Sequence, residues 1–417
     1  MAKGNKNPAP IWTSAFVRVT AGNFLLFTGF QFLLPTVPPY AADLGAGKTA
    51  VGIVVGTMPV LAILVRPFVG VALDRLGRRG PLLFGLAVHG LAMGLYALAP
   101  SLGGLTGLVA ARALQGIGWG TASTAFGTLA ADLVPAERRG EGIGYFGLSS
   151  ALGMAVGPAI GDWLYARGPN ILFAGAFAFT ALAFLLMLPP LPKSPLGREP
   201  SKAKRTLLSR GWTGLLSASF EPASLWPALL AGLMTITYGG IVGFLPLFGR
   251  EVGVAAAGLF FSVNAVVTFL VRLVAGRAFD RRGYPVVALA ALSGTAGLLL
   301  LAEARTLSDF LLAAAFYGVA FGVIQPALQA WAVHLSTPER RGAANAMFYS
   351  AFDLGIGTGA ALCGPIATSA GYRAMYRWLA WVFALFLVLG AVAPRPHLTE
   401  GPDPQQTSPR ERVRRRR

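Results

Sequence analysis

The sequence predicts an all-α membrane protein with twelve transmembrane helices, arranged as two pseudo-symmetric six-helix bundles. Three observations lead to this prediction. First, 54% of the 417 residues are hydrophobic and only 12% are charged, whereas an average soluble domain is about a quarter charged. Second, apolar runs of about 20 residues recur along the chain, and each is long enough to cross a hydrocarbon core of roughly 30 Å. Third, the two halves of the sequence repeat each other.

The apolar runs define the spans in order. We place them at 14–38, 50–73, 81–99, 105–132, 142–166 and 170–191, and then at 225–249, 257–279, 285–303, 307–334, 343–368 and 373–393. Such long runs favour helices over a β-barrel, whose strands alternate in segments of about 10 residues. We therefore expect an N-terminal bundle at 1–192, a basic linker at 193–224, a C-terminal bundle at 225–393 and a disordered basic tail at 394–417.

The distribution of basic residues predicts the orientation. Most of the 35 Lys and Arg residues fall on the side of the membrane that holds both termini. Because cytoplasmic loops are enriched in Lys and Arg, we expect both termini to be cytoplasmic in a multi-pass protein of the cell membrane. The basic residues form short tracts rather than one soluble patch, which argues against nucleic-acid binding and favours contact with the lipid bilayer. The other side has six: Lys48, Arg167, Arg250, Arg305, Arg373 and Arg377.

Two pairs of similar segments establish the internal repeat. VRPFVGVALDRLGRR begins at Val65 and VRLVAGRAFDRRGYP begins at Val271, an offset of 206. PAERRG at Pro135 and TPERRG at Thr337 are related by an offset of 202. Parallel repeats of this kind place a substrate site at the interface between the halves, near the middle of the bilayer.

The loop after the second span carries a motif of glycines and charges. The string GVALDRLGRR, from Gly70 to Arg79, resembles the G-x-x-x-D-R-x-G-R-R loop of the major facilitator superfamily. We expect Gly70 to let two helices approach closely, Gly77 to permit a tight turn and Asp74 to lie at the positive end of a helix. Arg78 and Arg79 can pair with acids such as Asp132. An ordinary basic turn is the alternative. The proposed gating residues are Gly70, Asp74, Arg75, Gly77, Arg78 and Arg79, with counterparts Gly276, Asp280, Arg281 and Gly283.

Two further motifs extend the resemblance. Arg112-Ala-Leu-Gln115-Gly116 in the fourth span is similar to the R-x-x-Q-G pattern of the same superfamily. A buried arginine is costly in lipid, so it faces the interior or water; snorkelling to the surface is the alternative.

The fifth span carries Gly153, Gly157, Pro158 and Gly161, which resemble the G-x-x-x-G-P-x-x-G pattern of the twelve-helix drug:proton antiporter branch. In that branch the motif is associated with export and with sealing one end of the cavity. A generic packing face is the alternative. The resemblance covers about residues 12–394 and implies alternating access, without defining the substrate.

Four ionisable side chains within the spans need explanation: Arg66, Arg112, Arg272 and Asp353. Asp353 is roughly 15 Å deep and Arg66 roughly 12 Å deep, at 1.5 Å per residue. Since helices 2 and 11 meet in the superfamily fold, Arg66 and Asp353 can form a pair that protonation of Asp353 weakens, which would couple proton movement to conformation. A permanent structural pair is the alternative. Many related exporters have an acid in the first helix, but this helix has only Asn23 and Gln31.

Polar and aromatic side chains on the expected cavity helices suit an amphipathic, aromatic or anionic ligand; contact with lipid is the alternative for each aromatic. No phosphate-binding loop, metal-ligand spacing or catalytic motif occurs, so we expect no enzyme activity, cofactor or metal. The candidate cavity residues are Gln115, Trp119, Tyr145, Phe146, Tyr238, Trp331, Phe348 and Tyr349.

The sequence as a whole predicts a secondary active transporter. We expect proton-coupled efflux of small amphipathic or drug-like compounds by a monomer. An uptake symporter or facilitator for a small metabolite is the alternative, and a non-transporting membrane receptor or enzyme is a third hypothesis, which the double repeat with its gating loops disfavours.

Overall fold

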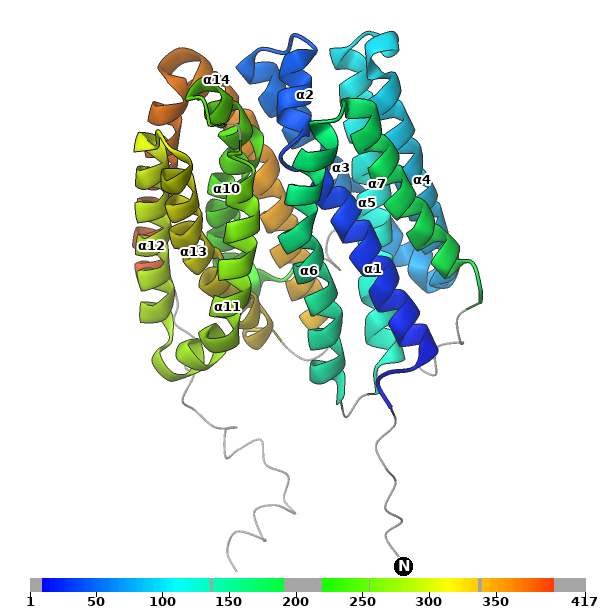
Figure 1. Ribbon diagram of the computed structural model, residues 1–417. Helices are drawn as coiled ribbons and strands as arrows, with labels where there is room; N and C mark the ends of the chain where they lie inside the picture. The colour runs from blue at the N-terminus through cyan, green and yellow to red at the C-terminus, as the bar shows by residue number, and fades with distance from the viewer. Residues whose placement is uncertain (1–9, 136–137, 191–219, 255, 337–339, 394–417) are drawn as a thin grey trace, which may run out of the picture.

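The computed structural model describes residues 10–135, 138–190, 220–254, 256–336 and 340–393 (Figure 1). The expected linker at 193–224, apart from residues 220–224, and the expected tail at 394–417 lie outside the described residues. The described residues form helices and their connections, without a β-strand.

The N-terminal bundle begins with a span made of two helices. Thr13 caps the first helix by accepting a hydrogen bond from the Phe16 amide at 3.2 Å, and two prolines, Pro38 and Pro39, lie in the first turn of the second, where no amide hydrogen is needed. The helices are α1 (Ser14–Phe32), α2 (Val37–Asp43), α3 (Lys48–Arg75), α4 (Arg79–Leu98), η1 (Ala99–Leu102), α5 (Leu105–Leu133), α6 (Arg139–Tyr165) and α7 (Pro169–Met187).

The C-terminal bundle follows the same order. Its last helix has 52 residues, but Gly371 has φ 81° and ψ 170°, so the helix breaks there. This break falls between the predicted spans 343–368 and 373–393 and separates two crossings. The helices are η3 (Pro222–Ser224), α10 (Leu225–Glu251), α11 (Leu259–Arg282), α12 (Tyr284–Glu303), α13 (Leu307–His334) and α14 (Arg341–Val392).

Ten helical segments in the described part of the chain are long and apolar enough to cross a membrane. One of them, Ala343–Val392, contains the two crossings that meet at Gly371. The 29-residue α5 is not among the ten, since it carries polar residues such as Arg112 and Gln115 along its length. With α5 included, the described part of the chain has twelve crossings, the number that the sequence predicts.

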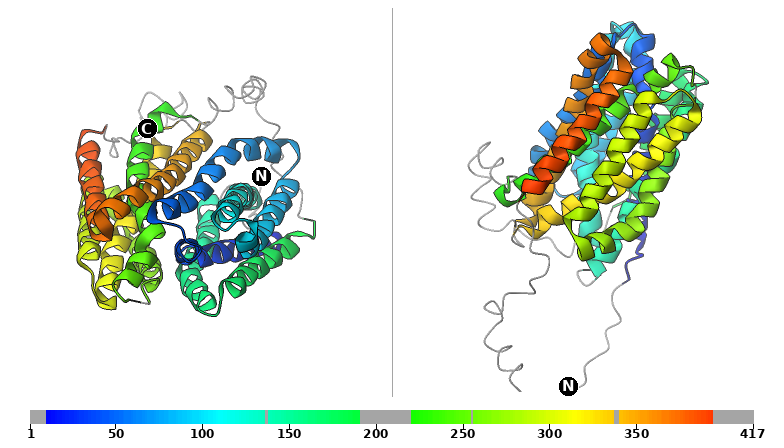
Figure 2. Two further views of the ribbon diagram at one scale, coloured as in Figure 1. Left: turned by 90° about the horizontal axis from the view of Figure 1, so that it is seen from above. Right: turned by 90° about the vertical axis from the view of Figure 1, so that its left-hand side faces the viewer.

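The two bundles lie side by side and are related by the repeat (Figure 2). Between the bundles, the most extensive contacts join α3 to α14 and α6 to α11. The repeat makes α3 equivalent to α11 and α6 equivalent to the first part of α14, so these two contacts are counterparts of each other. Within the bundles, α1 packs on α6 as α10 packs on α14. The pseudo-symmetry expected from the sequence is therefore present in the fold.

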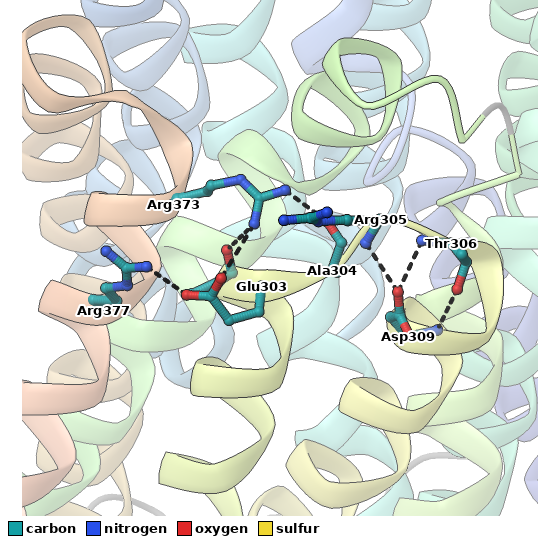
Figure 3. Close-up of polar contacts among 8 residues, drawn as sticks. Glu303, Ala304, Arg305, Thr306, Asp309, Arg373 and Arg377 are labelled. Carbon is teal, nitrogen blue, oxygen red and sulfur yellow. Dashed lines mark hydrogen bonds and ion pairs between the residues drawn. The ribbon is translucent and has the colours of Figure 1, made fainter.

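Polar contacts fasten the end of α12 to the second part of α14 (Figure 3). The Glu303 carboxylate lies 3.5 Å from Nη1 of Arg373 and also pairs with Arg377. Nearby, Asp309 and Thr306 form a capping box at the start of α13, with the Thr306 amide donating to Asp309 at 2.9 Å. These contacts lie within one bundle, so they stabilise that bundle without joining it to the other.

Candidate functional site

The interface between the bundles has two ends. We call the end that carries the turns at Gly77 and Gly283 the Gly77 face, and the opposite end, which carries α2, the α2 face (Figure 1). Both glycines have a positive φ, 81° at Gly77 and 64° at Gly283. The tight turn predicted at Gly77 is confirmed, and its repeat counterpart adopts a turn as well.

Two ion pairs join the bundles at the α2 face. Nη1 of Arg250 lies 2.8 Å from Oδ1 of Asp43, and Nζ of Lys48 lies 3.6 Å from Oε2 of Glu251. The Tyr165 hydroxyl donates to Oδ2 of Asp43 at 2.5 Å, which orients that carboxylate. Because the partners come from different bundles, this network holds the α2 face closed.

The Gly77 face differs. Among the described residues, no ion pair joins the bundles at this end. A Cβ added to Gly70 or Gly276 would meet nothing within 4 Å. The predicted close helix approach at Gly70 is therefore wrong in this conformation, because no neighbouring helix covers that part of α3. Among the described residues, the ion pairs between the bundles therefore lie at the α2 face and at Arg66 and Asp353, and none lies at the turns of the Gly77 face.

The arginines after Gly77 contact their own bundle. Nε of Arg78 lies 2.9 Å from Oδ2 of Asp132, which confirms the expected pairing with an acid at a helix end. Arg79 instead donates to the backbone carbonyl of Leu188, and Arg281 is exposed. The side chains of three motif residues lie outside the described ones: Asp74, Arg75 and Asp280.

The glycines of α6 pack within the N-terminal bundle. A Cβ at Gly153 would lie 3.0 Å from Oγ1 of Thr28, and one at Gly161 would lie 2.6 Å from Cα of Phe32. These glycines recur every fourth residue, so they share one face, and α1 covers that face. The expected sealing of the bundle interface by the glycines themselves is not seen. The next residue, Asp162, contacts Gly258 of α11 in the other bundle.

Arg66 and Asp353 form an ion pair between the bundles. Nη1 of Arg66 on α3 meets Oδ2 of Asp353 on α14, and the two side chains are 21% and 16% exposed. The contact predicted from the sequence is therefore present. An acid buried in a spanning helix is costly unless it has such a partner.

Arg112 lies in the interior rather than at the surface, which excludes snorkelling in this conformation. Its Nη2 donates to the carbonyl of Val55 at 2.9 Å and its Nη1 to Oε1 of Gln115 at 2.9 Å. The Val55 carbonyl is free because Pro59, four residues later in α3, has no amide hydrogen to donate to it. Arg112 takes the place of the missing donor and ties α5 to α3.

Arg272, the repeat counterpart of Arg66, has a different environment. It donates a hydrogen bond to Oε1 of Gln325 on α13. It forms no ion pair with any acid among the described residues. The four charges expected inside the spans thus behave in three ways. Arg66 and Asp353 form an ion pair. Arg112 donates to backbone carbonyls and to Gln115, which are uncharged. Arg272 has no charged partner among the described residues.

The expected cavity residues divide into two groups. Trp119 stacks on Phe30 with ring centroids 3.9 Å apart, and Gln115 bonds to Arg112, so both lie beside the interface. Tyr349 is 40% exposed. Tyr238 is almost buried, at 8% exposed. Four others pack against neighbouring side chains: Tyr145 against Trp12, Phe146 in the N-terminal core, and Trp331 and Phe348 in the C-terminal core.

A small cavity lies where α1, α2, α3, α5 and α10 meet, beneath the closed α2 face. Arg112 is the one residue among its lining that the sequence motifs identify. The break between α1 and α2 and the proline at Pro59 are the sequence signals that point to this region. Within the described residues, no group of three His, Cys, Asp or Glu side chains is placed to hold a metal ion. The cavity is lined by Phe30, Leu33, Leu34, Val37, Pro38, Val55, Arg112 and Val242.

Comparisons with known proteins agree with this geometry. A model of the Major Facilitator Superfamily matches residues 19–304 and 248–416. The staphylopine export protein of Staphylococcus aureus is 25% identical over 396 residues, which cover 91% of this chain and 97% of that protein. Quinolone resistance protein NorA of the same organism is 26% identical over 165 residues, 40% of this chain and 42% of NorA. A crystal structure of the nucleoside transporter NupG has a TM-score of 0.75 at 14% identity, covering 93% of this chain and 100% of that one.

Two six-helix bundles, closed at one end and meeting across a charged interface, define a membrane transporter for small molecules. The chain belongs to the Major Facilitator Superfamily. It is a multi-pass membrane protein, and its relatives and structural neighbours are transporters rather than enzymes.

Proposed function

We propose that this protein is a proton-coupled exporter of small amphipathic compounds. It works as a monomer in the cytoplasmic membrane, with both termini in the cytoplasm. The excess of Lys and Arg on the Gly77 face supports this orientation. The names of two relatives, an export protein and a quinolone resistance protein, support export. In this orientation the α2 face, which two ion pairs between the bundles hold closed, faces the outside.

The observation that carries the coupling is the ion pair between Arg66 and Asp353. It joins α3 to α14, the larger of the two contacts between the bundles. An ion pair requires a charged carboxylate, so the conformation with the α2 face closed corresponds to the state that has released its proton. Protonation of Asp353 on the outside removes the pair, and the return to the conformation with the α2 face closed restores it. Substrate leaves in one half of this cycle and the proton enters in the other.

Inverted membrane vesicles test the coupling. With an acidic interior and external norfloxacin, a quinolone, as the probe, the native protein should accumulate the probe. Asp353→Asn cannot ionise, so we expect accumulation to fall to the level of vesicles without the protein. Glu303→Gln is the matched control, because Glu303 pairs with arginines of its own bundle. Intact proton-driven accumulation by Asp353→Asn would disprove the coupling role.

The same vesicles test the direction of transport. Proton-driven accumulation in right-side-out vesicles, with none in inverted vesicles, would show that the protein is an uptake symporter. A thermal-shift screen of the purified protein extends the probe set, since a ligand that binds the folded state raises its stability by mass action.

A further inference from the structure

The internal symmetry of the protein is broken at one pair of charges. The contact of α3 with α14 and that of α11 with α6 are counterparts. The offset of 206 relates Arg66 to Arg272, and the offset of 202 relates Ala151 to Asp353. The first contact therefore has an arginine and an acid, whereas the second has an arginine and an alanine.

Ala151 lies on the face of α6 that points toward α11. Asp162 touches Gly258 at the start of α11, so the face of α6 that carries Asp162 is the one that meets α11. Eleven residues separate Ala151 from Asp162, and eleven residues are about three helical turns, which brings Ala151 to within roughly 20° of the same face. An acid at position 151 would face α11 as Asp353 faces α3.

Arg272 points into the space between the bundles rather than into lipid. Thr268, one turn earlier on the same face of α11, is 6% exposed, whereas Leu270 and Val274 are 55% and 61% exposed. Each of those two residues lies two positions from Arg272, about 200° around the helix, and Leu273, which is 61% exposed, lies about 100° around it. The lipid-facing side of α11 is therefore turned away from Arg272. Gly276, one turn further, borders open space.

The groups around Arg272 are polar but uncharged. Its guanidinium donates to Gln325 on α13, and Gln329 lies one turn further along the same helix. Nε2 of Gln329 donates to the Tyr349 hydroxyl at 3.1 Å. Arginine stays charged in proteins, and a charge within the membrane is costly until it is neutralised. Arg272 is ten residues from the end of α11 at Arg282, roughly 15 Å from that end, which is too deep for lipid headgroups.

We propose that Arg272 binds a carboxylate group of the transported compound, which takes the place of the acid that is missing at position 151. The planar guanidinium can form two parallel hydrogen bonds to a carboxylate, and Gln325 and Tyr349 offer further polar contacts beside it. The substrates are then amphipathic organic acids. This assignment rests on the proposed function, since it names the substrate class of the same transport pathway.

Binding to the purified full-length protein in a neutral detergent tests the proposal. The probes are matched pairs of an aromatic carboxylate and its primary amide: 2-naphthoate with 2-naphthamide, and norfloxacin with its amide. We expect the native protein to prefer the carboxylates, and Arg272→Gln to weaken carboxylate binding roughly tenfold or more while amide binding changes less than about twofold. Arg272→Lys should retain part of the preference. If no carboxylate binds, or if Arg272→Gln leaves the preference unchanged, the proposal is overturned.

A second pair of variants keeps Arg272 in place. Ala151→Asp should supply the missing acid, pair with Arg272 and remove the preference for carboxylates, whereas the equally large Ala151→Asn should keep it. If Arg272→Gln fails to fold, the comparison of Ala151→Asp with Ala151→Asn tests the proposal without it. The same preference for carboxylates over amides in both variants would contradict the proposal.

Equilibrium binding requires no proton gradient, so the two hypotheses can fail separately. A carboxylate preference without vesicle accumulation would contradict the proposed export and leave the carboxylate site standing. Equal export of acids and amides, unaffected by Arg272→Gln, would contradict the carboxylate site and leave export standing.

Discussion

Arg112 supplies a hydrogen bond that a proline removes from another helix. Pro59 leaves the Val55 carbonyl without its helical donor, and the guanidinium of Arg112 supplies one at 2.9 Å. A second bond, from Nε to the Val54 carbonyl at 3.1 Å, strengthens the same contact. The arginine is 7% exposed, so these backbone dipoles and Gln115 solvate its charge in place of water.

This arrangement predicts a dependence between two substitutions. Arg112→Met should destabilise the protein by about 1–3 kcal/mol, because a buried carbonyl loses its donor. Pro59→Ala restores an amide hydrogen at the position that reaches Val55, so it should recover part of that loss in the Arg112→Met background. The apparent Tm of the four proteins in detergent measures the coupling. Strictly additive effects would show that Arg112 does not replace the missing helical bond.

At the scale of elements, glycines decide where helices from different bundles touch. A Cβ at Gly56 of α3 would lie 2.8 Å from the carbonyl oxygen of Gly357 on α14, closer than real Cβ atoms approach. About four turns further along α3, at Gly70, the same addition meets nothing within 4 Å. One helix therefore carries a glycine that is required for contact and another that is not.

The two glycines predict opposite effects of the same substitution. Gly56→Ala should lower the apparent Tm and slow transport, because the backbone of α14 must move away from α3. Gly70→Ala should leave the Tm unchanged or raise it, since alanine in a helix is favoured over glycine by about 1 kcal/mol. Thermal unfolding and vesicle uptake of the two variants provide the comparison. Similar effects of both variants would contradict the assigned contact.

The sequence predicts which residues share a helix face, but not which helix covers that face. The spacing of Gly153, Gly157 and Gly161 places these glycines on one face of α6, but only the structure shows that α1 of the same bundle covers that face. Trp331 and Phe348 likewise lie in the C-terminal core, because their orientation around the helix depends on neighbours that are distant in the sequence. The pair of Arg66 with Asp353 was predictable because a lone acid in a span needs a cation, and because the resemblance to the superfamily implies that the helices of these two residues meet.

At the scale of the whole molecule, the two ends of the interface are held differently. The α2 face has two ion pairs between the bundles. In the shorter one, Asp43 with Arg250, the side chains are 51% and 46% exposed. Exposed pairs contribute roughly 0.2–1 kcal/mol each. Such weak closure suits a transporter, because the α2 face must open in every cycle.

We therefore predict that Asp43→Asn opens the α2 face more often. A cysteine at Val242, which lines the cavity beneath this face, reports opening by its reaction with a membrane-impermeant maleimide added from outside; the native Cys363 is buried. The labelling rate should rise roughly two- to fivefold, and high salt should have a similar effect in the native protein. Glu303→Gln, on the same face but within one bundle, is the control. No change with Asp43→Asn would show that the pair does not hold the face closed.

The polarity of α5 has a consequence for how the protein is made. A helix with an arginine and a glutamine in its first half is a poor candidate for independent insertion by the translocon, because each such residue adds to the cost of entering lipid. The carbonyls that receive Arg112 belong to α3, which is synthesised earlier. We expect α5 to leave the translocon together with its predecessors, so glycosylation mapping of nascent chains should show efficient insertion of α5 only when α3 and α4 precede it.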